Sequence, residues 1–109
     1  MTVETGSLFN EIPEVLGQEL FTQLAQGSAF RLERIVSRGH TSPESGWYDQ
    51  EEDEWVVVLQ GEAKIYFYDQ QVEHLIAGSY INIPARTRHR VGWTSPDTET
   101  VWLAVHYKA

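Results

Sequence analysis

Glu54 has the residue type and the position of a buried acid. It ends a run of four consecutive acids and directly precedes the apolar run WVVVL at Trp55–Leu59. An ionised carboxylate taken out of water costs several kcal/mol unless a cation or hydrogen-bond donors compensate it. Because Glu54 shares strand parity with Val56 and Val58, we expect its carboxylate to point into the interior. The acids at 51–53 then form a solvated loop.

His89 is expected to point into the same interior. It shares parity with Val91 and Trp93, an apolar set, whereas Arg88 and Arg90 have the opposite parity. A Glu and a His that converge in an apolar interior form either two ligands of a metal site or an acid–base pair. The two side chains could equally be a satisfied hydrogen-bonded pair without a metal. The sequence leaves these alternatives open.

A divalent ion at this place would need a third ligand, and the sequence offers three alternatives for it. They are the amide oxygen of Gln50, the carboxylate of Asp49 and the imidazole of His40. With His40 the set becomes two histidines and one carboxylate, the triad of iron enzymes. With Gln50 or Asp49 the site is rich in oxygen and favours Mn²⁺ or Fe²⁺ over Zn²⁺.

The elements that must position these residues are β-strands. Short runs rich in β-branched and aromatic residues alternate with turn signals, a pattern typical of sandwiches and barrels. No helical periodicity follows residue 18, and residues 1–18 form an irregular arm. The predicted strands cover 19–25, 30–37, 54–60, 62–68, 72–76, 79–84, 88–94 and 100–107.

Two of the predicted strands, 54–60 and 100–107, are apolar at both parities, which indicates strands covered on both faces. A barrel of this size cannot bury both faces in one interior. The outward set Trp55, Val57 and Leu59 therefore needs a cover, from a second β layer of the same chain, from the arm or from a second subunit. We expect a two-fold symmetric homodimer. His106 shares parity with Trp102 and Ala104, which would allow it to enter the barrel, but we expect it to pack at the end of its strand.

Composition limits the possible partners. The chain has 109 residues and no cysteine, which excludes disulfides and thiolate metal sites. Its net charge of −8 repels phosphate backbones, so nucleic acid is not an expected partner. No apolar window is long enough for a membrane span, and the first residues lack the features of a signal peptide. We expect a cytoplasmic protein with a small-molecule partner.

The residues discussed above, Glu54 and His89, belong to a pattern by which the chain resembles a small single-domain cupin. Gly78, Pro84 and His89 keep the spacing of the second cupin motif, and Glu54 with Gly61 fits the end of the first. The resemblance covers residues 30–107. It implies an antiparallel cupin-type β-barrel, also called a double-stranded β-helix or jelly roll, at 19–107 of a single domain 1–109 that begins with the arm 1–18.

The resemblance also has a departure. Cupins place a His-x-His pair shortly before the Glu of the first motif, and this chain has Tyr48 and Gln50, or Trp47 and Asp49, there. The family's ligand set is thereby reduced to Glu54 and His89, with Gln50, Asp49 or His40 as alternatives for completing it.

The resemblance implies a function in two alternative forms. The first is a metal-dependent enzyme of the isomerase, cyclase or dioxygenase type, holding Mn, Fe, Ni or Zn and no organic cofactor, with Tyr48 as a proton donor. The second is a metal-free module that binds or senses a small molecule. Homodimers are common among cupins, which agrees with the assembly expected above.

Overall fold

The computed structural model describes residues 2–108, and this part of the chain consists of eight β-strands with no helix. Each strand that the sequence predicts is present, with ends shifted by no more than one residue, so the all-β fold is confirmed. The strands are β1 (Leu20–Gln26), β2 (Phe30–Ser37), β3 (Asp53–Gln60), β4 (Glu62–Phe67), β5 (Val72–Ile76), β6 (Tyr80–Ile83), β7 (His89–Thr94) and β8 (Thr100–Tyr107).

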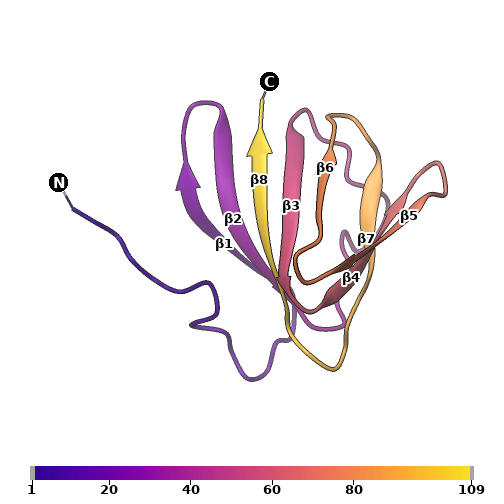
Figure 1. Ribbon diagram of the computed structural model, residues 1–109. Coiled ribbons are helices and arrows are strands. Elements are labelled where there is room, and N and C mark those ends of the chain that lie inside the picture. The colour runs from indigo at the N-terminus through magenta and orange to yellow at the C-terminus, as the bar shows by residue number, and fades with distance from the viewer. Residues whose placement is uncertain (1, 109) are drawn as a thin grey trace.

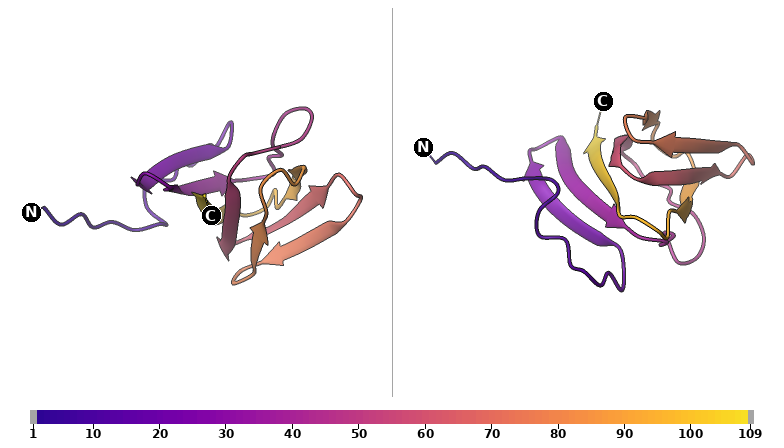
Figure 2. Two further views of the ribbon diagram at one scale, coloured as in Figure 1. Left: turned by 90° about the horizontal axis from the view of Figure 1, so that it is seen from above. Right: turned by 60° about the horizontal axis from the view of Figure 1, so that its bottom comes forward.

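The strands form two antiparallel sheets. The larger has the order β1-β2-β8-β3-β6, and the smaller has the order β5-β4-β7. Figures 1 and 2 show the two sheets curving toward one another, with the arm leading away from β1. The buried cluster draws on both sheets, so the core lies between them; its members are Val56, Val58, Ala63, Ile65, Leu75, Ile83, Trp102 and Ala104. This is the two-sheet arrangement that the resemblance implied.

The inner face of β3 follows the predicted parity. Glu54, Val56 and Val58 are buried, and the alternate residues Trp55 and Val57 are only partly buried. The period of two along a strand therefore carries the carboxylate of Glu54 inside together with its apolar neighbours.

β7 departs from the predicted parity. His89 and Val91 face inward as expected, but the register with β4 shifts at the next residue, so that Trp93 pairs with Lys64. Directly paired residues share a face, and Trp93 consequently lies on the outer face, where the Lys64 ammonium sits 5.4 Å from its ring centroid. The prediction of an inward Trp93 is wrong because Gly92 inserts one extra residue into the strand.

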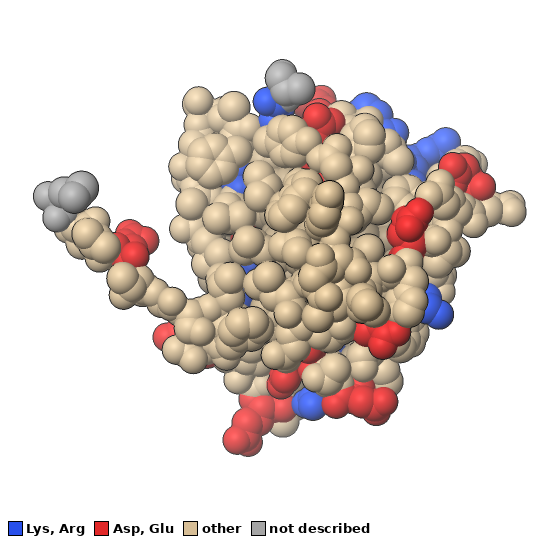
Figure 3. Space-filling view, in the orientation of Figure 1, with Lys and Arg blue, Asp and Glu red and all other residues tan. Residues whose placement is uncertain are grey.

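The arm lies against the outer face of the larger sheet at its β1 edge. The buried Arg34 of β2 donates from Nη1 to the carbonyl oxygens of Leu8, at 3.2 Å, and Asn10, at 2.6 Å. The outward residues of β3, including Val57, lie two strands away in the sheet order and stay partly exposed. In Figure 3 the centre of the face turned to the viewer, over β8 and β3, carries few charged side chains.

The homodimer remains a prediction that this face supports. Light scattering at micromolar concentration should give a mass of about twice 12.5 kDa. Val57→Glu places a charge at the middle of the apolar outer face and should yield the monomer, whereas Thr98→Glu in an exposed turn should leave the mass unchanged. A parent protein with a measured mass of 12.5 kDa would contradict the prediction.

Among residues 2–108 no helix has the length and apolarity to cross a membrane.

Candidate functional site

A cavity of about 140 Å³ lies between the inner faces of the two sheets. Its walls combine apolar and aromatic side chains with a small number of polar groups, the usual composition of a ligand pocket. The lining residues are Glu19, Phe21, Arg31, Glu33, Ile35, Ser42, Tyr48, Gln50, Glu54, Val56, Ile65, Ile83, His89, Val91, Trp102 and His106. A cavity of this volume holds a ligand about the size of one aromatic ring.

Glu54 is the centre of the polar groups in this cavity. Its Oε1 lies 3.3 Å from His89 Nε2 and accepts a hydrogen bond from Gln50 Nε2 at 3.1 Å. Its Oε2 lies 3.8 Å from Nε2 of His106, the residue opposite Glu54 in the β3–β8 register. Burial raises the pKa of Glu54, but the hydrogen bond from His89 and the nearby imidazoles outweigh burial and hold this pKa below its ordinary value. Glu54 is therefore a carboxylate.

The orientation of the His89 ring is fixed by a hydrogen bond to the backbone. Its Nδ1 donates to the carbonyl oxygen of Thr87 at 2.7 Å, which leaves Nε2 facing Glu54. Reciprocal backbone hydrogen bonds with Tyr48 hold the first residue of β7 against the loop before β3. Burial lowers the pKa of His89, but the hydrogen bonds to Glu54 and to the Thr87 carbonyl, together with the charge of Glu54, outweigh burial and raise this pKa overall. Glu54 and His89 thus form a buried pair in which each group favours the ionised form of the other.

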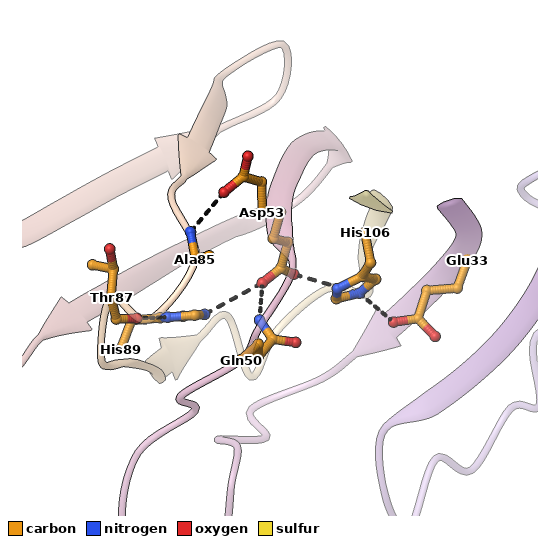
Figure 4. A network of polar contacts seen from close by, with 8 residues as sticks. Glu33, Gln50, Asp53, Ala85, Thr87, His89 and His106 are labelled. Carbon is orange, nitrogen blue, oxygen red and sulfur yellow. Dashed lines mark hydrogen bonds and ion pairs between the residues drawn. The ribbon is translucent and has the colours of Figure 1, made fainter. Parts of the chain in front are cut away.

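His106 and Glu33 extend this pair into a network that the sequence analysis missed. His106 Nε2 lies 3.1 Å from Glu33 Oε1, and both side chains line the cavity. Figure 4 shows His89, Gln50, His106 and Glu33 in this one network. We expected His106 to pack at a strand end; its parity with Trp102 and Ala104, which are buried in the core, was the signal that it faces the interior.

The remaining predicted site residues divide into two groups. Tyr48 and Gln50 line the cavity, and burial is the main cause of the raised pKa of Tyr48. Asp49 instead forms an ion pair with Arg86 at 3.0 Å, where both side chains are well exposed. His40 is not among the lining residues; its Nδ1 accepts from the backbone N–H of Arg38 at 2.8 Å. The structure therefore brings Glu54, His89 and Gln50 together and leaves Asp49 and His40 apart.

The acids before Glu54 are not all solvated. Glu51 is exposed, but Glu52 forms an ion pair with Arg31 at 2.7 Å. Asp53 lies in β3 and accepts a hydrogen bond from the backbone N–H of Ala85 at 2.7 Å, as Figure 4 also shows. The expectation of a solvated loop at 51–53 is confirmed only for its first residue, because the others bind groups on neighbouring elements.

The donor atoms in the cavity do not fit a metal centre as they are placed. No three His, Cys, Asp or Glu side chains within residues 2–108 are grouped so as to hold a metal ion. The cavity side chains instead follow one another in the order His89, Glu54, His106 and Glu33, so that each imidazole already faces a carboxylate. A metal-bound histidine usually donates its second ring N–H to an acceptor. His89 has such a partner in Thr87, whereas His106 Nδ1 is buried without one.

Comparison with known proteins gives one family and many similar structures. The family model of the Cupin domain matches residues 34–106. A protein from Ralstonia eutropha JMP134 named "putative mannose-6-phosphate isomerase" is 40% identical, with 98% of this chain and 100% of that chain covered and a TM-score of 0.91. No curated protein matches the chain.

More distant structures share the fold alone. A conserved protein of unknown function from Streptococcus pyogenes is 22% identical, with 100% of this chain and 90% of that chain covered and a TM-score of 0.75. An RmlC-like cupin from Desulfovibrio desulfuricans is 16% identical, with 97% of each chain covered and a TM-score of 0.76.

Proposed function

The chain belongs to the cupin family, and on this premise we propose that it is a metal-free module that binds a small molecule between its sheets. The observation that carries the proposal is the cavity of about 140 Å³ with the Glu54–His89 ion pair in its wall. Apolar walls supply the free energy of binding, and a few fixed polar groups orient the ligand. Both parts are present at this cavity.

The ion pair gives the cavity a proton donor and an acceptor in fixed positions. His89 is held by Thr87 on one side and faces Glu54 on the other, so neither ring nitrogen can turn away. Gln50 adds a further hydrogen bond to the same carboxylate. A ligand with one polar group would meet this preorganised pair in the wall of the cavity, and binding would require little rearrangement.

A metal-dependent enzyme of the isomerase type is the second candidate. The observation that favours it is the 40% identity over nearly the whole chain to the Ralstonia eutropha protein named above. In that case Glu54 and His89 would be ligands, with Gln50 in addition, and the ion would polarise a substrate oxygen. Against it stands the placement of the donor atoms, which face one another rather than a common point.

Elemental analysis separates the two candidates. Protein purified from a culture supplemented with Mn, Fe, Ni and Zn should contain far less than one metal ion per chain, and adding each ion should leave the Tm unchanged. His89→Gln is the matched variant, because it retains a polar side chain but removes the imidazole ligand. A stoichiometric metal in the parent that disappears in His89→Gln would overturn the metal-free proposal and support the enzyme.

A further inference from the structure

The cavity carries an excess of carboxylates. Glu19, Glu33 and Glu54 line it, against the guanidinium of Arg31 and the imidazole of His89, which is paired with Glu54. Arg31 is already neutralised by Glu52, which lies outside the lining, at 2.7 Å. The whole chain, with a net charge of −8, adds to the negative potential. An anion entering this cavity would find no unpaired Lys or Arg among the residues that line it.

Two of the three carboxylates that line the cavity have no Lys or Arg partner among residues 2–108. Glu19 accepts from the Ser37 hydroxyl at 2.5 Å and Glu33 from the His106 ring at 3.1 Å, and neither has a Lys or Arg partner within residues 2–108. In the tautomer that donates Nε2–H to Glu33, the buried Nδ1 of His106 is an acceptor without any donor. An ammonium group brings three N–H donors and a positive charge, whereas a carboxylate or phosphate brings acceptors only.

The rest of the wall suits the apolar body of such a ligand. Phe21, Tyr48 and Trp102 contribute aromatic rings, and aliphatic side chains from both sheets line the same cavity. Aromatic faces attract cations, most strongly where water is excluded. The volume of about 140 Å³ accommodates a single ring or a short branched chain with its amino group.

We propose that this cavity selects small organic amines in their ammonium form and rejects anions such as sugar phosphates. The proposal rests on the proposed binding function and specifies its ligand class. Glu33 and Glu19 attract the ammonium group, and the aromatic wall holds the apolar body.

Three probes of one shape test the charge preference. Benzylammonium, benzyl alcohol and benzoate share a ring and differ in charge, and their affinities can be compared by calorimetry at pH 7 and low salt. Benzylammonium should bind about tenfold more tightly than benzyl alcohol, as expected when one charge-assisted hydrogen bond is gained. Benzoate should give no measurable heat.

Glu33→Gln keeps the shape and an acceptor for His106 but removes one charge, so benzylammonium affinity should fall about tenfold while that of benzyl alcohol stays the same. Glu19→Gln serves as a second variant if Glu33→Gln does not fold. Glu14→Gln, an exposed position on the arm, changes the net charge equally and should have no effect.

The outcomes distinguish the two levels of the proposal. Equal binding of benzyl alcohol, or binding of benzoate or mannose 6-phosphate in place of benzylammonium, would overturn the preference for amines and leave small-molecule binding intact. Failure of every probe to bind would overturn both. A loss of affinity in Glu14→Gln as large as in Glu33→Gln would assign the effect to net charge and overturn the role of the cavity carboxylates.

Discussion

Gly61→Ala is expected to destabilise the protein by about 3 kcal/mol or more, because both strain and steric overlap act at this turn. Gly61 joins β3 to β4 with φ of +93°, in the region that side chains disfavour. A Cβ there would lie 2.6 Å from the Cα of Thr100 and 2.8 Å from the carbonyl oxygen of Glu99. Both atoms belong to the backbone and cannot move aside. Urea unfolding of the parent and the variant measures the difference.

Two other glycines separate the contributions of strain and overlap. Gly78 has φ of +91°, but a Cβ added there would have no neighbour within 4 Å, so Gly78→Ala should cost only the strain, about 1–2 kcal/mol. Gly17 has neither a positive φ nor a neighbour within 4 Å, and Gly17→Ala should change the free energy of unfolding little. If Gly61→Ala were no more destabilising than Gly78→Ala, the close approach of β8 to the turn would be contradicted.

Glu54→Met is expected to cost about 3–5 kcal/mol, the usual loss when one partner of a buried ion pair is removed. The variant leaves the buried His89 ring and the Gln50 amide without their acceptor. His89→Leu should cost a similar amount because it leaves the buried Glu54 carboxylate without its imidazole partner.

The double variant Glu54→Met with His89→Leu removes both charges and retains volume, so its cost in free energy of unfolding should fall well below the sum of the two single losses. Strict additivity in this cycle would show that the two groups do not interact.

The coupling in this cycle should depend on pH in a way that the two pKa shifts define. The pKa of Glu54 is lowered from 4.5, so its contribution is present above pH 4.5 and is lost as the pH falls through the folded-state value. The pKa of His89 is raised from 6.5, so its contribution is complete below pH 6.5 and is lost as the pH rises through the folded-state value. The coupling should therefore be largest between pH 4.5 and 6.5 and decline on both sides. A coupling that is the same at pH 5.5 and pH 9 would contradict the ion pair.

Strand positions and the burial of Glu54 and His89 could be predicted from the sequence, because both follow from local periodicity. Polar turn signals mark the strand ends, and alternation along β3 places Glu54 on the same side as two core valines. These patterns depend on a few adjacent residues only. The prediction for Trp93 was wrong because one inserted residue at Gly92 reverses the parity after it; a glycine inside a strand is the local signal for such a bulge, and simple alternation does not take it into account.

The wider network depends on pairing between distant strands, which no local pattern reveals. Glu54 meets His106 because β3 and β8 align in one register, and Glu33 reaches the same ring from β2 on the other side of β8. The sequence could not distinguish between the alternatives for a third ligand for a related reason. Asp49 and Gln50 are neighbours in the sequence, but the loop directs one toward Arg86 at the surface and the other toward Glu54.

The place of β8 at the middle of the larger sheet determines the order in which the fold can form. β8 is the last strand in sequence, yet it separates β2 from β3 and is the only described link between the β1–β2 hairpin and the β3–β6 pair in that sheet. During synthesis, β2 and β3 each keep one unpaired edge until Thr100–Tyr107 has been made. Because such distant pairing is slow, folding should be limited by the insertion of this strand. That same insertion brings His106 beside Glu54, so the polar network is assembled only when the sheet is complete.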